Sequence, residues 1–76
     1  MRLRLGRLRL LPFREVKRRL EARGFVEMSQ KGSHVKFVRQ AGSVVDTAIV
    51  PRKPEIPKGT LHSILNQAHI DLDDWE

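Results

Sequence analysis

The sequence contains no cysteine, and this absence excludes disulfide bonds, thiol chemistry and most structural zinc sites. No apolar run approaches the roughly 20 residues that a membrane-spanning helix needs. The basic first ten residues lack the unbroken apolar stretch of a secretory signal. No spacing of His, Asp and Glu indicates a metal site. We therefore expect a cytoplasmic protein with no membrane association and no metal or other cofactor.

The chain also lacks the length for more than one core. Its 76 residues are about half the usual size of a domain. A domain this small buries roughly 60% of the surface that its unfolded chain exposes, so it is marginally stable. We expect one domain over residues 11–76.

Positive charge is what the chain has in excess, and it is concentrated in one half. Residues 1–40 contain twelve Lys and Arg and three acids, a formal charge of +9. Residues 41–76 contain three Lys and Arg and six acids, a formal charge of −3. A basic half of this kind attracts polyanions, and RNA or DNA is the leading candidate. The alternative is a basic surface that is only solvated.

The first ten residues, MRLRLGRLRL, alternate arginine and leucine in two pieces, because Gly6 shifts the phase. This pattern fits an edge strand, a basic arm or a disordered leader. Terminal segments that nothing ties down are usually poorly ordered. We therefore expect residues 1–10 to form a flexible basic leader.

Two segments have the apolar spacing of helices. In residues 12–25, Phe13, Val16 and Leu20 form an i, i+3, i+7 stripe, and Gly24 suits the left-handed end of a helix. A second helix is predicted over residues 60–70, where the apolar stripe is Leu61, Ile64, Leu65 and Ala68. Its start is open between Pro57 and Thr60. Asp71 suits the cap of one last turn, and Trp75 is expected to seal the core.

Between the helices, alternating and β-branched residues predict three strands, with glycine-containing turns between them, at residues 25–30, 34–40 and 43–50. The order is helix, three strands, helix. We expect an α+β fold in which a three-stranded antiparallel sheet has both helices packed on one face, with the other face free and polar. This α-β-β-β-α layout is that of double-stranded-RNA-binding domains.

The stretch KGSHVKF, residues 31–37, combines residues suited to cleaving RNA. An imidazole such as that of His34 can transfer protons near neutral pH. Gly32 lets the backbone approach a phosphate, and Ser33 can donate a hydrogen bond to it. Lys31 and Lys36 add positive charge on either side. Each residue also has a simpler interpretation, because Gly32 can serve only the turn, Ser33 can bond its own backbone, and surface histidines are more often inert.

The chain resembles the HicA family of bacterial toxins over residues 11–75. The resemblance is carried by the first helix, the dipeptide GF, the stretch KGSHVKF, a strand ending in VP, and the residues GTLHSIL-QA-I. It implies the double-stranded-RNA-binding-domain fold and a type II toxin–antitoxin role. The toxin would be an mRNA interferase, an endoribonuclease inhibited by a HicB-type antitoxin. Because no spacing of His, Asp and Glu indicates a metal site, we expect metal-independent cleavage by attack of the RNA 2′-OH. The family's catalytic histidine falls on His34, with Gly32 and Ser33 as motif neighbours.

The chain departs from the family pattern in two places. Many relatives have a second histidine shortly after the strand ending in VP, where this chain has Arg52 and Lys53. Either cation can hold a phosphate, but neither is a good proton donor at neutral pH. The second departure is the Arg/Leu leader, which is an added RNA-binding arm or the product of a start site assigned too early.

Further candidate contacts with RNA lie outside the histidine stretch. Lys58 and Thr60 open the second helix, and a helix N-terminus with a lysine is a suitable seat for phosphate. Simple helix capping is the alternative there. Arg18, Arg19 and Arg23 either follow the RNA backbone or only solubilise the first helix. The rival functions are a non-catalytic RNA-binding module of the same fold and a DNA-binding regulator.

Overall fold

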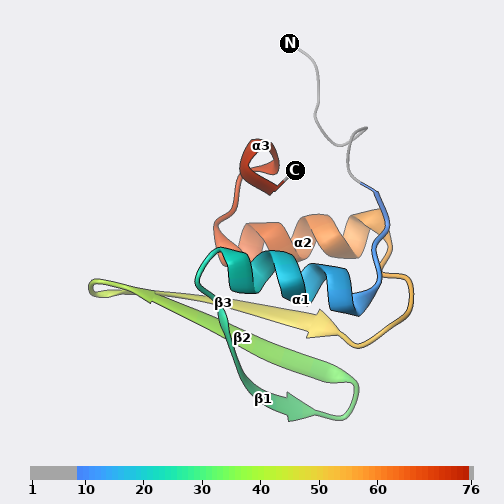
Figure 1. The fold of residues 1–76 in the computed structure, drawn as a ribbon, viewed down its shortest axis with the longest axis horizontal. Coiled ribbons are helices and arrows are strands. Elements are labelled where there is room, and N and C mark those ends of the chain that lie inside the picture. Colours follow the sequence, from blue (N-terminus) through green and yellow to red (C-terminus); the bar gives the residue numbers. More distant parts are fainter. Residues whose placement is uncertain (1–8, 76) are drawn as a thin grey trace.

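The computed structural model describes residues 9–75 and shows a three-stranded sheet with its helices on one side (Figure 1). The elements are α1 Phe13–Ala22, β1 Val26–Lys31, β2 His34–Ala41, β3 Val44–Pro51, α2 Lys58–Ala68 and the short α3 Leu72–Trp75. This order confirms the predicted α-β-β-β-α layout and the α+β class. Most of the expected leader at residues 1–10 lies outside the described residues, so its flexibility stays a prediction.

The strands pair antiparallel in the order β1-β2-β3, so each strand lies beside its neighbour in the sequence. Both hairpins turn through two residues, Gly-Ser, at positions 32–33 and 42–43. The backbone φ is +60° at Gly32 and +62° at Gly42, and neither serine has a positive φ. Glycine at the first turn position with positive φ is the pattern of a type II′ hairpin turn, which suits the twist of the flanking strands.

The core lies between the helices and one face of the sheet. Because strand side chains alternate, every second residue of β2 and β3 faces the helices. The apolar stripes predicted for the two helices are both confirmed as buried. The buried apolar residues are Phe13, Val16, Leu20, Phe25, Val35, Phe37, Ala48, Val50, Ile56, Leu61, Ile64, Leu65, Ala68, Ile70 and Trp75.

The helix ends settle what the sequence left open. Helix α2 begins at Lys58 with Pro57 as its N-cap residue, so Pro57 marks the start and Thr60 lies in the first turn. Helix α1 ends as predicted, because Gly24 has a φ of +91° and the N–H of Phe25 donates to the carbonyl oxygen of Leu20 (3.1 Å). The final turn is also confirmed. Trp75 is only 2% exposed.

The open face of the sheet was expected to be polar, and this expectation is only partly right. Apolar side chains are exposed on β1 and β3, with exposed fractions of 58% for Val26, 62% for Met28, 56% for Val45 and 38% for Ile49. β-Branched residues favour strands wherever their side chains point, because they fit a pleated surface. The sequence pattern of these segments therefore predicts reliably that they form strands, but it does not predict which of their side chains are buried.

Candidate functional site

The candidate site is built on the turn between β1 and β2. Gly32 and Ser33 occupy the two turn positions, and Lys31 pairs with His34 across the hairpin. The side-chain amide of Gln30 donates a hydrogen bond to the carbonyl oxygen of Gly32 (2.9 Å), which adds a constraint on the turn. A two-residue turn has little backbone freedom. The side chains of Ser33 and His34 therefore project from a well-defined backbone.

The segment that follows β3 is tied to the same turn. The backbone N–H of Arg52 donates to the carbonyl oxygen of Ser33 (2.6 Å), and Pro51 pairs with His34 across the sheet. The guanidinium of Arg52 lies 4.6 Å from the ring centroid of Phe13, within the range of a cation–π interaction. The backbone of Arg52 therefore lies beside the histidine turn, while its guanidinium is directed toward Phe13 of α1.

Three of the predicted residues share the open face of the sheet. Val35 and Phe37 are buried toward the helices, so the alternation of side chains turns His34 and Lys36 to the opposite face. Lys31 is directly opposite His34 in the ladder and therefore lies on the same face. All three side chains are exposed. The histidine thus has a lysine on either side of it on one surface.

The charge of this surface is not neutralised by neighbours. Within residues 9–75, no ion pair or side-chain hydrogen bond involves Lys31, His34 or Lys36. Two lysines without acidic partners leave a local excess of positive charge at the turn. An anionic ligand such as a phosphate is therefore favoured there.

Lys53, Lys58 and Thr60 lie at the same end of the molecule but in the helical layer. Figure 1 shows the β1–β2 turn, the end of β3 and the start of α2 on one side of the fold. The N-cap residue of α2, Pro57, makes no side-chain cap hydrogen bond, and all residues from Pro57 to Thr60 are exposed. Free N–H groups at a helix start attract anions. The structure therefore brings Lys31, His34 and Lys36 together at the turn, whereas Lys53, Lys58 and Thr60 lie apart from it.

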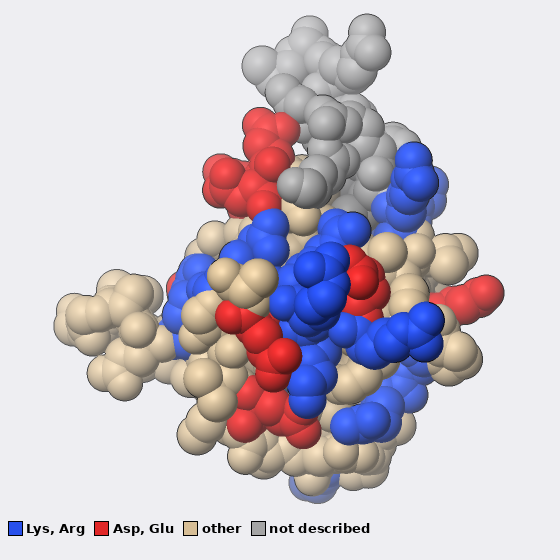
Figure 2. Space-filling view, in the orientation of Figure 1, with Lys and Arg blue, Asp and Glu red and all other residues tan. Residues whose placement is uncertain are grey.

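The cations of α1 differ from those at the turn, because most of them are paired with acids. Nζ of Lys17 lies 2.7 Å from Oε1 of Glu27, and Nε of Arg19 lies 2.8 Å from Oε2 of Glu15. Hydrogen bonds from Arg18 and Arg19 lower the pKa of Glu15 from 4.5 to about 2. Figure 2 shows the basic side chains over α1 interspersed with acidic ones. The i, i+3 and i, i+4 spacing to Glu15 is the sequence signal that indicates this pairing.

A polar cluster around the buried Asp46, which the sequence pattern did not predict, holds the end of α2 against the sheet. Asp46 faces inward from β3 and is 6% exposed. Its carboxylate accepts a hydrogen bond from Nη2 of Arg39 (2.7 Å), and Nδ1 of His69 lies 2.8 Å from its other oxygen. The hydrogen bond from Arg39, followed by that from His69, lowers the pKa of Asp46. An aspartate at an inward position of β3, directly opposite Arg39, is the signal that could have found this cluster.

His69 has a structural position in this cluster. It is the C-cap residue of α2 and has left-handed backbone angles, φ 57° and ψ 44°, which are unusual for a residue other than glycine. Because an ionised carboxylate only accepts hydrogen bonds, the contact with Asp46 requires the proton on Nδ1 of His69. The aspartate therefore fixes both the ring and the end of the helix.

Two wider features of residues 9–75 complete the description. None of the described helices is long and apolar enough to cross a membrane. In the same part of the chain, no group of three or more His, Cys, Asp or Glu side chains is arranged to hold a metal ion.

Comparison with known families gives one match. The family model described as the HicA toxin of bacterial toxin-antitoxin matches residues 13–70, which is most of the chain. Neither the comparison with curated proteins nor the comparison with solved structures gives a match. The matched region contains all the elements from α1 to α2, and therefore the whole histidine turn.

Proposed function

Because the chain belongs to the HicA family of toxins from bacterial toxin–antitoxin systems, we propose that it cleaves mRNA and uses His34 as a general acid or base. The observation that supports this proposal best is the position of His34. Its side chain is exposed on a constrained turn, with Lys31 and Lys36 on the same face and neither lysine in an ion pair within residues 9–75. A protein acting on mRNA in this way works in the cytoplasm.

RNA supplies the nucleophile for this reaction. The 2′-OH attacks the adjacent phosphorus, the bond to the 5′ oxygen breaks, and a cyclic phosphate and a free 5′-OH result. One proton must leave the 2′-OH and one must reach the 5′ oxygen, and an imidazole suits either transfer. The attack is intramolecular, so it needs no metal ion to generate a nucleophile. We assign one of the two proton transfers to His34.

The neighbours of His34 stabilise the charge that develops on the phosphate. Lys31 and Lys36 provide positive charge on the same face, and the hydroxyl of Ser33 can donate a hydrogen bond to a phosphate oxygen. Gly32 has no side chain to obstruct the approach of the RNA backbone. A guanidinium is a permanent cation and a poor proton donor, so we assign Arg52 to charge and not to proton transfer.

The remaining candidate residues are assigned to binding along the RNA strand. Lys53, Lys58 and Thr60 lie at the same end of the fold as the histidine turn, and the exposed start of α2 suits a phosphate (Figure 1). Each phosphate that a protein cation neutralises releases a counterion, so affinity falls steeply with salt. The paired cations of α1 are weaker candidates, because binding RNA would first require them to leave Glu15 and Glu27.

The toxin–antitoxin family implies an antitoxin partner. We propose that this partner is of the HicB type and that it covers His34 and the surrounding lysines. An acidic surface on the antitoxin would match the charge of this face. The antitoxin would then block RNA by occupying the same surface.

The decisive experiment is His34→Ala, with His62→Ala as the matched control on α2. We expect His34→Ala to abolish mRNA cleavage and growth arrest while RNA affinity stays within a few-fold. His62→Ala should keep both. A 2′-deoxy substitution at the cut site should block cleavage by the unaltered toxin. Normal cleavage by His34→Ala would overturn the assignment, and undiminished cleavage of the deoxy substrate would overturn the chemistry.

A non-catalytic RNA-binding module of the same fold is the second candidate, because the basic turn and the start of α2 can also grip duplex RNA by shape. This candidate predicts RNA binding without cleavage by the unaltered protein. A DNA-binding regulator predicts that DNA of equal length competes fully with RNA. The cleavage and competition assays therefore distinguish the nuclease, the RNA-binding module and the DNA-binding regulator.

A further inference from the structure

The two edges of the sheet differ in how they are protected from pairing with another strand. On the edge strand β1, the register shifts between Glu27 and Ser29, and the strand ends at Lys31. A bulge and charged side chains are common protections of an exposed edge. The edge strand β3 has neither near the β2–β3 turn, because its register with β2 is continuous and residues 40–45 carry no charge. The first part of β3 is therefore an open edge.

The backbone groups on this edge can be assigned from the contact of Ile49. Its N–H donates to the side-chain oxygen of Gln67 on α2 (3.0 Å), so it points away from β2. Because the N–H and C=O groups of an antiparallel strand alternate between its two sides, those of Val45 and Thr47 also point away from β2. Helix α2 thus covers the edge at Ile49. The outward groups of Val45 and Thr47 have no hydrogen-bond partner within residues 9–75.

The outer part of the β2–β3 hairpin, residues 40–45, projects from the body of the molecule. Figure 1 shows β2 and β3 extending beyond the helices on the side opposite the β1–β2 turn, and Figure 2 shows the end of this projection without Lys, Arg, Asp or Glu. Its residues are all exposed, with exposed fractions of 57% for Val44 and 56% for Val45. On a chain of net charge +6, such a projection is a contact surface that avoids charge repulsion.

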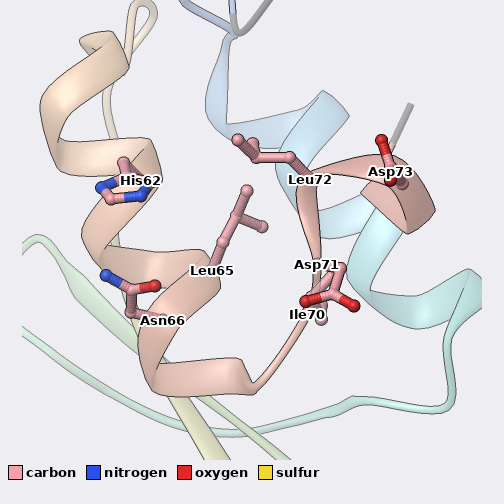
Figure 3. Close-up of a pocket in the computed structure, with 7 residues that line it drawn as sticks. All are labelled: His62, Leu65, Asn66, Ile70, Asp71, Leu72 and Asp73. Atoms are coloured by element: carbon pink, nitrogen blue, oxygen red, sulfur yellow. The ribbon is translucent and has the colours of Figure 1, made fainter. Parts of the chain in front are cut away.

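The groove between α2 and α3 offers less apolar surface to a partner. Figure 3 shows Leu65 of α2 and Leu72 of α3 reaching into the space between the two helices. Leu65 is only 1% exposed and Ile70 only 9%, so these side chains are already used within the core. A partner that buries apolar surface therefore gains more at the hairpin than at this groove.

We propose that a second copy of this chain pairs with the open edge of β3 around a two-fold axis, so that the two three-stranded sheets become continuous. The pairing is antiparallel and centred on Val45, which lies opposite Val45 of the second copy. Ser43 then lies opposite Thr47 of the second copy. This inference does not depend on the proposed nuclease activity.

Charge selects this register over its nearest alternative. A pairing centred on Asp46 would use the same edge, but it would place two carboxylates directly opposite each other, and like charges in that position are unfavourable. Centred on Val45, the pairing sets each Asp46 opposite Val44 of the other copy. The paired segment, residues 43–47, also ends before the part of the edge that α2 covers.

The properties of the edge favour a second copy over the other partners considered. RNA and an acidic antitoxin surface are attracted to cations, and residues 40–45 contain none. The histidine turn lies at the other end of β2, so both copies keep it free. Among the described strands each chain has one open edge of this kind, so the assembly closes at two copies. Residues 43–47 form a small contact compared with the roughly 20–30 residues a side of a standard interface, so the dimer should be weak.

The first test measures self-association of the full chain by sedimentation equilibrium over a range of concentrations. The unaltered chain should pass from a monomer of 8.8 kDa to a dimer as its concentration rises. Val45→Lys and Val45→Glu should each lose the dimer, because like charges then face each other. An equimolar mixture of the two variants should regain it, which also shows that both are folded. Met28→Lys, an exposed position on β1, is the matched control and should dimerise like the unaltered chain.

Several results of this test would overturn the proposal. They are a monomer at every concentration of the unaltered chain, a mass that keeps rising beyond the dimer, and a dimer that persists in Val45→Lys. Equal loss of the dimer in Met28→Lys would do the same, because it would report the added charge and not the edge of β3. If the mixture of Val45→Lys and Val45→Glu stays monomeric, the two copies do not meet at this residue.

The second test examines the register with single cysteines, which the cysteine-free chain allows. Val45→Cys sets two thiols opposite each other, where the Cα atoms of a hydrogen-bonded pair lie about 5.5 Å apart, within the span of a disulfide. Thr47→Cys faces the same side of the sheet, but the two copies of this residue are four positions apart, or roughly 13 Å. On air oxidation, Val45→Cys should form the covalent dimer at least about tenfold faster. Equal rates would refute the proposed pairing, because random collisions produce them.

Discussion

The two Gly-Ser turns at the ends of β2 provide a matched pair of substitutions, Gly32→Ala and Gly42→Ala. Both glycines have φ near +60°, and an added Cβ would meet no atom within 4 Å at either position. The two substitutions therefore impose the same backbone strain without a steric clash. Only Gly32 lies in the candidate site, while Gly42 lies at the far end of the hairpin (Figure 1).

The strain can be given a magnitude. A positive φ of this kind costs an L-residue roughly 1–3 kcal/mol. Alanine recovers roughly 0.4–1 kcal/mol by restricting the unfolded chain. The net loss should be about 1 kcal/mol for each variant, which lowers the melting temperature by about 4–8 °C in a domain of this size. At roughly 0.05–0.15 kcal/mol per residue, the 76-residue chain has about 4–11 kcal/mol in total, so both variants stay folded.

The two variants should differ in RNA cleavage. Gly32→Ala changes the turn that presents Ser33 and His34 and that accepts the backbone hydrogen bond from Arg52. We expect its single-turnover cleavage rate to fall at least about tenfold, because small misplacements of catalytic groups have large effects. Gly42→Ala should cleave within about twofold of the unaltered protein. Thermal unfolding followed by circular dichroism measures the stability of both.

Two results would refute this reasoning. If Gly32→Ala loses stability but cleaves at the normal rate, the geometry of this turn does not matter to the reaction. If Gly32→Ala and Gly42→Ala lose cleavage equally, the loss reports general destabilisation and not a site. Ser33→Ala and Ser43→Ala form a second pair with the same logic, and only the first should slow cleavage.

Three other predictions follow from the contacts described above. Because the pKa of Glu15 is lowered from 4.5 to about 2, its contribution to stability is complete above pH 4.5 and is lost as the pH falls toward 2. The difference in unfolding free energy between the unaltered protein and Glu15→Gln, measured by denaturant titration, should therefore shrink over that window. Trp75→Ala removes a buried side chain and should lower the free energy of unfolding by about 3–5 kcal/mol, measured by circular dichroism, while a much smaller loss would show that α3 does not belong to the cooperative core. Lys36→Ala should reduce the slope of log affinity against log salt by about 0.7–0.9 for RNA, whereas Lys17→Ala, which is paired with Glu27, should leave the slope nearly unchanged.

The features that could be predicted from the sequence are those that depend on local spacing. The apolar stripe of α2, ending at Ala68, and the Gly-Ser turns are each determined within a few residues. The turn chemistry of the candidate site belongs to this class. The glycine-containing turn predicted between residues 30 and 34 is confirmed, and the structure adds that Lys31 pairs with His34 across it.

The features that the sequence did not reveal depend on contacts between distant segments. The hydrogen bond from the backbone N–H of Arg52 to the carbonyl oxygen of Ser33 forms only if β3 ends directly opposite His34. This register is a property of the whole sheet. The cluster of Asp46 and His69 joins a strand to the end of a helix. The exposed apolar residues of β1 and β3 were misassigned for a different reason, because a single sequence does not distinguish strand propensity from burial.

The arrangement of the three strands also has a consequence for how quickly the protein becomes active. Each strand pairs with its neighbour in the chain through a two-residue turn, so the sheet assembles without closing a long loop. Chains dominated by such local pairings fold rapidly. A newly synthesised chain therefore reaches its folded state with little delay, and an antitoxin that is present when translation ends can bind it from the start.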